Sequence, residues 1–365
     1  MSTALEIAGL FAFEGKPVDA KPYGCGHIND TYCVCCEREE KPQRRYILQR
    51  INRHVFKDMP ALMDNLVRVT GYLRQAVLEA GGDPDRECLN LVSTKEGKPY
   101  YVSPEGEYWR AFLFIENAIT FQTVGKPESF YYAGCAFGRF QRLLAGYPSE
   151  TLHETIPHFH DTASRYRDFE RAVEENASGR ADKAAEEIAF VRARQRDTAV
   201  LTEMLAAGEL PLRVTHNDTK LNNVMLDDVT GKPVCVIDLD TVMPGLSLYD
   251  FGDSIRFGAN PAAEDETDLS KVKLDLGLFE QYTKGFLEEC GDRLTENEIR
   301  MLPFSAKIMT LECGMRFLAD HIAGDTYFKI HREGHNLDRC RTQLKLVEDM
   351  EKKMDDMAAI VAKYV

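Results

Sequence analysis

One stretch of this chain, Val214–Leu226, combines polar residues whose types and spacing could perform chemistry. It reads H-x-D-x-K-x-x-N, with His216, Asp218, Lys220 and Asn223 at the named positions. A carboxylate at Asp218 can accept the proton of an attacking hydroxyl, and a lysine ammonium two residues later can reach a γ-phosphate. The amide oxygen of Asn223 is a hard ligand of the kind that magnesium prefers. The pattern therefore predicts phosphoryl transfer, with Asp218 and Lys220 as catalytic residues and His216 orienting the loop backbone.

A second acidic motif follows downstream, where the apolar run Val234–Leu239 contains Asp238 and is followed by Asp240. Together with Asn223, these two carboxylates are the expected ligands of a magnesium ion that accompanies ATP. A single Asp, Asn or His in a loop is more often a cap or turn residue. The full pattern, followed by an apolar strand that ends in Asp238, is much rarer by chance. It favours an ATP- and magnesium-dependent kinase over a structural loop.

Further along the chain, Asp250-Phe251-Gly252 has the sequence of the metal-binding tripeptide of protein kinases but stands in the wrong context, so we treat it as a decoy. It stands too far from Asn223 and follows a Pro244-Gly245 turn instead of an apolar strand. We expect Asp250 to be structural and tied to the loop that carries Asp218. Asp253 and Arg256 follow at helical spacing and could pair with each other.

The elements that must position these residues differ between the two parts of the chain. Residues 23–34 read as strand, glycine turn and strand, and 45–51 and 107–115 are further β-rich runs. Residues 59–78 carry apolar residues at helical spacing, and a Gly-Gly-Asp-Pro run stops that helix. Beyond Glu116-Asn117 the pattern is mostly helical, including one or two long helices over 164–207.

A β-rich part followed by a helix-rich part predicts an α+β fold. The length suits two domains or two lobes of one enzyme. We place a nucleotide-covering lobe at residues 1–117, ending in a hinge at Phe114–Ala118. A helical lobe over 118–365 would carry the catalytic loop and the acceptor pocket.

The composition excludes several partner classes. The formal net charge is −14, and no basic stripe is present, so nucleic acid is not an expected partner. No apolar run is long enough to span a membrane, and the N-terminus carries no secretory signal pattern, so the expectation is a cytoplasmic protein. We expect a monomer whose partners are a nucleotide and a small-molecule sugar acceptor.

At this point the chain resembles the aminoglycoside phosphotransferase and choline kinase-like superfamily, through the 216–223 loop and Ile237–Asp240. More narrowly it is similar to bacterial N-acetylhexosamine 1-kinases. That narrower resemblance rests on further strings, which run from near residue 20 to near residue 345: Gly26-His27-Ile28-Asn29, Tyr46-Ile47-Leu48-Gln49-Arg50, His158-Phe159-His160-Asp161-Thr162, Arg213 to Asn223, Asp250 to Ser254, and Glu312 to Asp320.

The resemblance implies a protein kinase-like two-lobed fold, with a small β-rich lobe over ATP and a hinge that binds adenine through backbone groups. It implies phosphorylation of the anomeric hydroxyl of N-acetylglucosamine and N-acetylgalactosamine. It also implies roles for named residues: the nucleotide-binding set is Gly24, Gly26, Gln49, Arg50, Phe114 and Glu116, and the sugar-binding set is His27, Asp218, Arg316 and Tyr327.

The chain departs from the wider kinase pattern at one point. A phosphate-contacting lysine is expected on the strand 46–50, which instead ends in Gln49-Arg50. Only one of these two can face the nucleotide, because successive strand residues point to opposite sides. The helix that starts at Met59 should offer a glutamate to pair with that cation, but it carries only Asp64 and Asn65 at the relevant place.

Two alternatives remain open. One is a kinase of another small alcohol, such as choline, homoserine or methylthioribose, which would use the same Asp218, Asn223 and Asp238. The other, from a different class, is a non-catalytic ATP-binding protein on a kinase fold. The absent lysine favours it, and the presence of the base and both metal ligands speaks against it.

Overall fold

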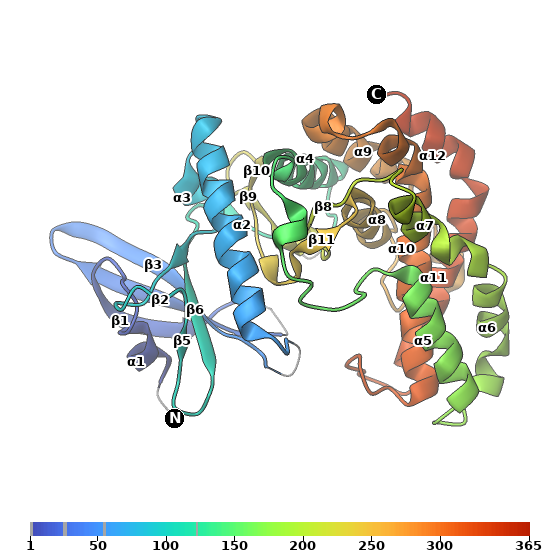
Figure 1. Ribbon diagram of the computed structural model, residues 1–365, viewed down its shortest axis with the longest axis horizontal. Helices are drawn as coiled ribbons and strands as arrows, with labels where there is room; N and C mark the ends of the chain where they lie inside the picture. Colours follow the sequence, from blue (N-terminus) through green and yellow to red (C-terminus); the bar gives the residue numbers. More distant parts are fainter. Residues whose placement is uncertain (1–2, 25–27, 54–55, 122) are drawn as a thin grey trace. The chain divides into compact units, whose positions relative to one another are not determined.

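The computed structural model describes residues 3–24, 28–53, 56–121 and 123–365. The chain forms two compact units. The first comprises the chain through Ile119, Thr151–Ile156 and Met225–Met243, and the second comprises Thr120–Glu150, Pro157–Val224 and Pro244–Val365. An antiparallel sheet dominates the first unit and helices dominate the second, which confirms the α+β prediction (Figure 1).

The main sheet of the first unit has the strand order β1-β2-β3-β6-β4, and β5 pairs with β6 outside this path. All of these pairings are antiparallel. The predicted β-rich runs 45–51 and 107–115 correspond to β3 and β6. The strands are β1 (Lys16–Pro22), β2 (Asp30–Arg38), β3 (Lys41–Arg50), β4 (Leu91–Val92), β5 (Tyr101–Val102) and β6 (Tyr108–Leu113).

The two faces of this sheet have different characters because successive strand residues point to opposite sides. One face packs Tyr46 of β3 and Trp109 of β6 into an apolar core that helix α1 (Ala4–Ala8) covers. Gln49 and Arg110 lie directly opposite each other on β3 and β6, and the alternation places both on the other face. The sheet therefore has one apolar face and one that carries buried polar groups.

Helix α2 (Met59–Glu79) confirms the helix predicted over 59–78. The Asp58 side chain caps it by accepting the N–H of Ala61 at 3.0 Å, and a proline occupies the first turn. The apolar residues that predicted the helix are buried along one stripe. The first unit also contains α3 (Pro84–Glu87) and a small sheet of order β10-β9-β7, formed by β7 (Ala118–Ile119), β9 (Val224–Asp227) and β10 (Pro233–Val236).

The second unit is built around α10 (Glu296–Ala323), which packs against α5, α8 and α11 and is buried on several sides. A capping box at Thr295 starts α10, and Gly324 in the left-handed region ends it. The other helices are α4 (Pro127–Leu144), α5 (Thr162–Glu175), α6 (Ala185–Arg192), α7 (Val200–Ala206), α8 (Ser247–Gly258), α9 (Leu276–Cys290), α11 (His335–Lys352) and α12 (Met354–Val361). None of the described helices has both the length and the apolar character needed to cross a lipid bilayer.

The segment 164–207, predicted as one or two helices, forms three, α5, α6 and α7, separated by turns. Helix α5 ends at Asn176, which adopts a left-handed conformation with φ of 41°. Gly179 follows with φ of +69°, a backbone geometry that suits glycine. The helical periodicity of this segment was correctly recognised, but these two turn residues interrupt it.

Candidate active site

The loop after β8 (Arg213–Thr215) is held in place by a buried carboxylate from α8. Asp250 is 0% exposed, and its two oxygens accept the backbone N–H groups of His216 and Asn217 at 2.9 and 2.8 Å. The side-chain amide of Gln141 donates a third hydrogen bond at 2.7 Å. Burial raises the pKa of the Asp250 carboxyl, and these N–H donors work in the opposite direction. The expectation that Asp250 is tied to the loop is confirmed.

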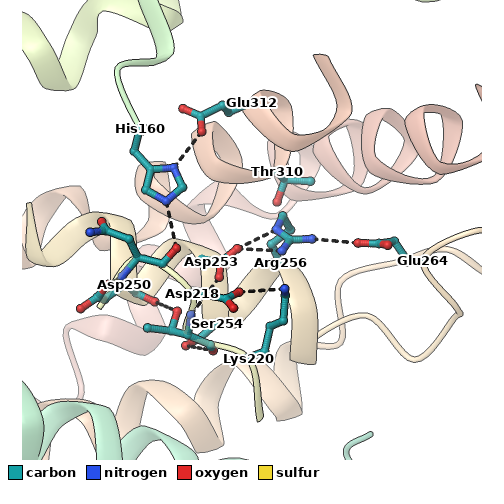
Figure 2. A network of polar contacts seen from close by, with 12 residues as sticks. His160, Asp218, Lys220, Asp250, Asp253, Ser254, Arg256, Glu264, Thr310 and Glu312 are labelled. Carbon is teal, nitrogen blue, oxygen red and sulfur yellow. Dashed lines mark hydrogen bonds and ion pairs between the residues drawn. The ribbon is translucent and has the colours of Figure 1, made fainter. Parts of the chain in front are cut away.

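The next turn of α8 fixes the following residue of the loop (Figure 2). Asp253 accepts the backbone N–H of Thr219 at 3.1 Å, and Ser254 donates to the Thr219 carbonyl at 2.8 Å. Arg256 donates to the other oxygen of Asp253 at 3.0 and 2.7 Å, as the helical spacing predicted. Burial acts to raise the pKa of Asp253, but the Arg256 guanidinium outweighs it and holds that pKa below its usual range. Asp253 is therefore an ionised acceptor for the loop.

Gly252, the glycine of the decoy tripeptide, has a packing role. A Cβ at this position would lie 2.4 Å from the carbonyl oxygen of Ser305 and 2.6 Å from Cγ of Met309, both on α10. Only glycine permits α8 to approach α10 this closely. The tripeptide thus serves helix packing and loop anchoring in the second unit.

Two histidines complete the support of the loop. His216 is buried against the rings of Phe137 and Phe140, and its Nδ1 accepts the N–H of Asp218 at 3.2 Å. His160 contacts the Asn217 carbonyl oxygen at 3.2 Å through Nε2, and its Nδ1 lies 2.8 Å from the Glu312 carboxylate. The predicted role of His216, orienting the loop backbone, agrees with this geometry.

The His160–Glu312 pair is buried beside the loop, and both ring nitrogens of His160 face oxygen atoms. Although burial opposes it, His160 lowers the pKa of Glu312, which is 1% exposed and also accepts the Thr162 hydroxyl at 2.6 Å. Figure 2 shows His160 linked to Glu312 and Asp253 linked to Arg256. His160 and the carboxylates of Asp250 and Asp253 thus hold successive peptide groups of residues 216–219.

The polar side chains of the motif converge on Asp218. The Lys220 ammonium lies 2.8 Å from Oδ1 of Asp218, and the Asn223 amide nitrogen donates to the Asp218 carbonyl at 2.8 Å and to Oδ2 at 3.3 Å. Burial acts to lower the pKa of Lys220, but the carboxylates of Asp218 and Asp253 outweigh it and raise that pKa, which keeps the ammonium charged. The structure therefore brings together Asp218, Lys220 and Asn223, the three residues that the sequence motif singled out.

The second acidic motif lies in the first unit, in a tight turn. Asp238 adopts a left-handed conformation with φ of 61°, and the turn Leu239–Thr241 follows it. Asp240 is 5% exposed, and its oxygens pair with the Arg110 guanidinium at 2.5 and 2.9 Å. The amide nitrogen of Asn29 donates to the same carboxylate at 2.9 Å. Asp240 is thus rigidly oriented by two side chains of the main sheet region.

Neither of the two polar residues of α2 considered as partners of a strand cation, Asp64 and Asn65, faces one. Asp64 is about half exposed and pairs with Arg68 and His153. Asn65 is buried and donates to the carbonyl oxygens of His153 and Val242 at 2.8 and 3.1 Å. The helix therefore braces the chain just after the Asp238 turn with an amide and supplies no carboxylate to β3.

The predicted nucleotide-binding residues of the first unit occupy different environments. Gly24 has φ of +80°, as expected of a glycine turn, whereas Gly26 and His27 lie outside the described residues. Gln49 and Arg50 point to opposite faces of the sheet, and Arg50 pairs with Asp30. Phe114 is buried beneath the Arg45 guanidinium, and that guanidinium also pairs with Glu116.

In the second unit, Arg316 lies between two aromatic rings. Its guanidinium carbon is 5.5 Å from the ring centre of Phe159 and 5.6 Å from that of Phe328. No carboxylate of the described residues forms an ion pair with it. Tyr327, 70% exposed, stands beside Phe328 with ring centres 4.8 Å apart. An arginine flanked by rings and without a carboxylate partner is suited to donate hydrogen bonds to a ligand.

Asp320 holds the loop that carries these aromatic residues. Its oxygens accept the backbone N–H groups of Thr326, Tyr327 and Phe328 at 2.9, 2.8 and 2.9 Å, and the Asn336 amide donates to it at 2.9 Å. The carboxylate at the end of α10 therefore fixes where Tyr327 and Phe328 stand relative to Arg316, one helical turn back.

The donor set suits magnesium better than zinc. Asn223 uses its side-chain nitrogen for Asp218, which leaves its oxygen as the group available to a metal. In the described ranges no three His, Cys, Asp or Glu side chains cluster as an all-protein metal cage. Magnesium is commonly held by one or two protein oxygens together with substrate phosphates, and the Asn223 amide oxygen is a donor of that kind.

The residues that anchor the site were only partly visible in the sequence. His160, Glu312, Asp250 and Asp253 lie in strings that carried the resemblance, but those strings gave no role to His160 or Glu312. Arg110 was missed. Its signal was a single charge in the middle of the apolar strand β6, where a buried arginine requires a partner.

Comparison with known proteins agrees with this geometry. The sequence profile of the phosphotransferase enzyme family matches residues 19–274. A microcompartment-associated aminopropanol kinase is 16% identical, with a TM-score of 0.61 over 97% of this chain and 98% of that one. An amicoumacin kinase in complex with AMP-PNP and Ca²⁺ is 13% identical, with a TM-score of 0.58 over 93% and 92%.

An aminoglycoside phosphotransferase from Alicyclobacillus acidocaldarius is 12% identical, with a TM-score of 0.64 over 100% of this chain and 97% of that one. At such identities the likeness is one of fold. It confirms the two-lobed, protein kinase-like class that the sequence predicted.

Proposed function

The chain belongs to the phosphotransferase enzyme family and is therefore a small-molecule kinase, and we propose that it transfers the γ-phosphoryl group of ATP to the anomeric hydroxyl of N-acetylglucosamine or N-acetylgalactosamine. The observation that carries the chemistry is the loop in which Lys220 and Asn223 both contact Asp218, while buried charged groups fix the backbone on either side. A base held this firmly costs little reorganisation when it accepts a proton.

In the proposed reaction, Asp218 accepts the proton of the attacking hydroxyl, the new bond forms to the γ-phosphorus, and the bond to ADP breaks. Lys220 keeps its charge and turns from Asp218 toward the γ-phosphate. Asn223 and Asp238, with Asp240 as the third predicted ligand, would hold magnesium. When bound, that ion neutralises charge on the phosphate oxygens.

Residues 1–117 are proposed to cover the nucleotide. Adenine would bind backbone groups of the hinge Phe114–Ala118, and the remaining contacts would come from Gly24, Gly26, Gln49, Arg50 and Glu116. The use of ATP is supported by the amicoumacin kinase that shares this fold and binds AMP-PNP. The helical lobe over residues 118–365 would carry the acceptor.

The acceptor is proposed to bind His27, Asp218, Arg316 and Tyr327. Arg316 has no carboxylate partner among the described residues and can donate charge-assisted hydrogen bonds to sugar hydroxyls. Tyr327 is 70% exposed, so its aromatic side chain is accessible to a ligand. These features support a neutral, hydroxyl-rich acceptor.

A second candidate is a kinase of a small amino alcohol, favoured by the fold likeness to an aminopropanol kinase. Arg165 donates to the Phe159 carbonyl at 3.2 and 3.1 Å, while Arg316 lies over the ring of the same residue. Glu312 and Asp168 supply negative charge beside these two guanidinium groups. Both acceptor classes are therefore included in the panel that follows.

A coupled assay of ADP release across a panel of acceptors tests the proposal. N-acetylglucosamine or N-acetylgalactosamine should give a turnover on the order of 1–100 s⁻¹, which is usual for kinases. Their methyl glycosides, which lack a free anomeric hydroxyl, serve as matched controls and should be inactive. A preference for choline, homoserine, methylthioribose or aminopropanol would establish the second candidate. Nucleotide binding without turnover on any acceptor would favour the non-catalytic alternative.

A further inference from the structure

The first unit has no lysine at the end of β3, and the glutamate of α2, Glu79, is the last residue of that helix and accepts from Gln75. The unit nevertheless contains a buried ion pair. Arg110 of β6 is 2% exposed and Asp240 is 5% exposed, and the two side chains contact each other through both carboxylate oxygens. Neither residue comes from β3 or α2. The cation of this pair comes from β6, and the carboxylate comes from the turn Leu239–Thr241 of the same unit.

The register of the sheet explains why Arg110 can occupy this position. Gln49 on β3 and Arg110 on β6 are Cα partners in the antiparallel ladder, so their side chains leave the same face next to each other. The side-chain oxygen of Gln49, Oε1, accepts hydrogen bonds from Nε and Nη2 of Arg110 at 3.0 and 2.8 Å. Gln49 in turn donates to the Thr31 hydroxyl at 3.1 Å. A cation missing from β3 is thus supplied one strand away.

The carboxylate partner belongs to the turn that carries Asp238. Asp240 receives the Arg110 guanidinium and the Asn29 amide, and Asn29 also accepts the backbone N–H of Asn52 at 3.0 Å. Two residues beyond Asp240, the Asn65 amide holds the Val242 carbonyl. The turn is therefore fixed by side chains from three separate parts of the first unit.

Burial makes this arrangement sensitive to substitution. Removing one member of a buried ion pair leaves the other as an uncompensated charge, which is strongly unfavourable. Without Arg110, the buried Asp240 carboxylate would lose the cation that contacts both of its oxygens and would have to move toward solvent. That change would move the turn that holds the left-handed Asp238.

We propose that Arg110, held by Gln49, takes the place of the strand lysine that this chain lacks, and that it acts as a positioning residue by fixing Asp240 and the Asp238 turn for magnesium–nucleotide binding. The inference rests on the proposed function, because it assumes that Asp238 and Asp240 serve a nucleotide-bound metal. It adds a residue and a pairing for which neither the family match nor the sequence motif gives a role.

Moving the cation between the two strands tests this directly. Arg110→Met should lower kcat/KM for ATP, and the affinity for magnesium, by on the order of 10–100-fold, the usual effect of losing a group that orients a metal ligand. Adding Gln49→Lys to Arg110→Met returns a cation to the adjacent strand and should recover most of that loss. A double variant no better than Arg110→Met alone would overturn the proposal.

Thermal unfolding with ADP gives a readout that a merely structural role would not move. The difference between the melting temperatures measured with ADP and magnesium and with ADP and EDTA reports magnesium-dependent binding. This difference should vanish in Arg110→Met and return in the double variant. The matched control is Arg44→Met. Arg44 lies on β3 and forms a part-exposed ion pair with Glu14, and its replacement should leave the magnesium-dependent difference in melting temperature unchanged.

Two outcomes separate failure of the inference from failure of the proposed function. If the wild-type protein shows no ADP-dependent shift, the proposed function fails. If wild type and Arg110→Met shift equally, only the inference fails. Should Arg110→Met not fold, Arg110→Lys keeps a buried cation but cannot contact Gln49 and both oxygens of Asp240 at once. That variant is expected to fold with a smaller magnesium-dependent difference, and an unchanged difference would overturn the inference.

Discussion

Replacing Asp218 with asparagine is expected to lower kcat by about a hundred- to ten-thousand-fold, the usual cost of losing a positioned general base. Asparagine keeps the shape of the side chain, its single amide oxygen can still accept from Lys220, and Asn223 can still donate to the backbone carbonyl at position 218. It cannot accept the proton of the attacking hydroxyl. Nucleotide affinity, measured as the ADP-dependent shift in melting temperature, should change little.

Asp292→Asn provides the matched control for this variant. Its side chain is 68% exposed and pairs only with the neighbouring Arg293 in the described structure, so activity should equal that of the wild type. A wild-type rate in Asp218→Asn would remove Asp218 from the role of base. Loss of nucleotide binding together with activity would instead point to a loop that no longer folds.

Asp238→Ala is expected to reduce magnesium-dependent turnover to the background of the assay. Asp238 is the proposed carboxylate ligand in the first unit, and magnesium needs such hard oxygen donors. The protein should stay folded, because alanine leaves the Arg110–Asp240 pair intact. Titrating magnesium at saturating ATP would measure the effect. Normal turnover of the variant at the magnesium concentrations that suffice for the wild-type protein would contradict the prediction.

Asp250→Ala is the informative comparison, because Asp250 sits in the decoy tripeptide. Its carboxylate satisfies two backbone N–H groups and an amide, and each buried donor left without an acceptor costs about 1–3 kcal/mol. We therefore expect a lower melting temperature as its main effect. A fully folded but inactive Asp250→Ala protein beside an active Asp238→Ala protein would reverse the two assignments.

The sequence correctly predicted an element when its cap, its apolar periodicity and its stop residue all indicated the limits that the packed structure has. Helix α2 has a capping aspartate, an apolar stripe at helical spacing and a glycine stop, and its predicted limits match the structure within a residue. The segment 164–207 was less well predicted. There the helical periodicity continues, but Asn176 and Gly179 adopt left-handed backbone conformations that end α5.

The loop motif indicated its own chemistry but not its supports. The type and spacing of Asp218, Lys220 and Asn223 are local properties, so sequence alone could suggest them. The His160–Glu312 pair joins residues 152 positions apart, and Arg110 and Asp240 are separated by 130 positions. Such pairings depend on tertiary packing, and an isolated buried charge in an apolar element is their only trace in the sequence.

Phosphorus NMR of the product formed from ATP and N-acetylglucosamine tests the central claim most directly. The account predicts a phosphomonoester on the anomeric oxygen, coupled to a single sugar proton, in an acid-labile product without a reducing end. This requires the C1 hydroxyl to lie beside Asp218 and in line with the γ-phosphate. A phosphate on the primary C6 hydroxyl, coupled to two protons in a product that keeps its reducing end, would contradict it.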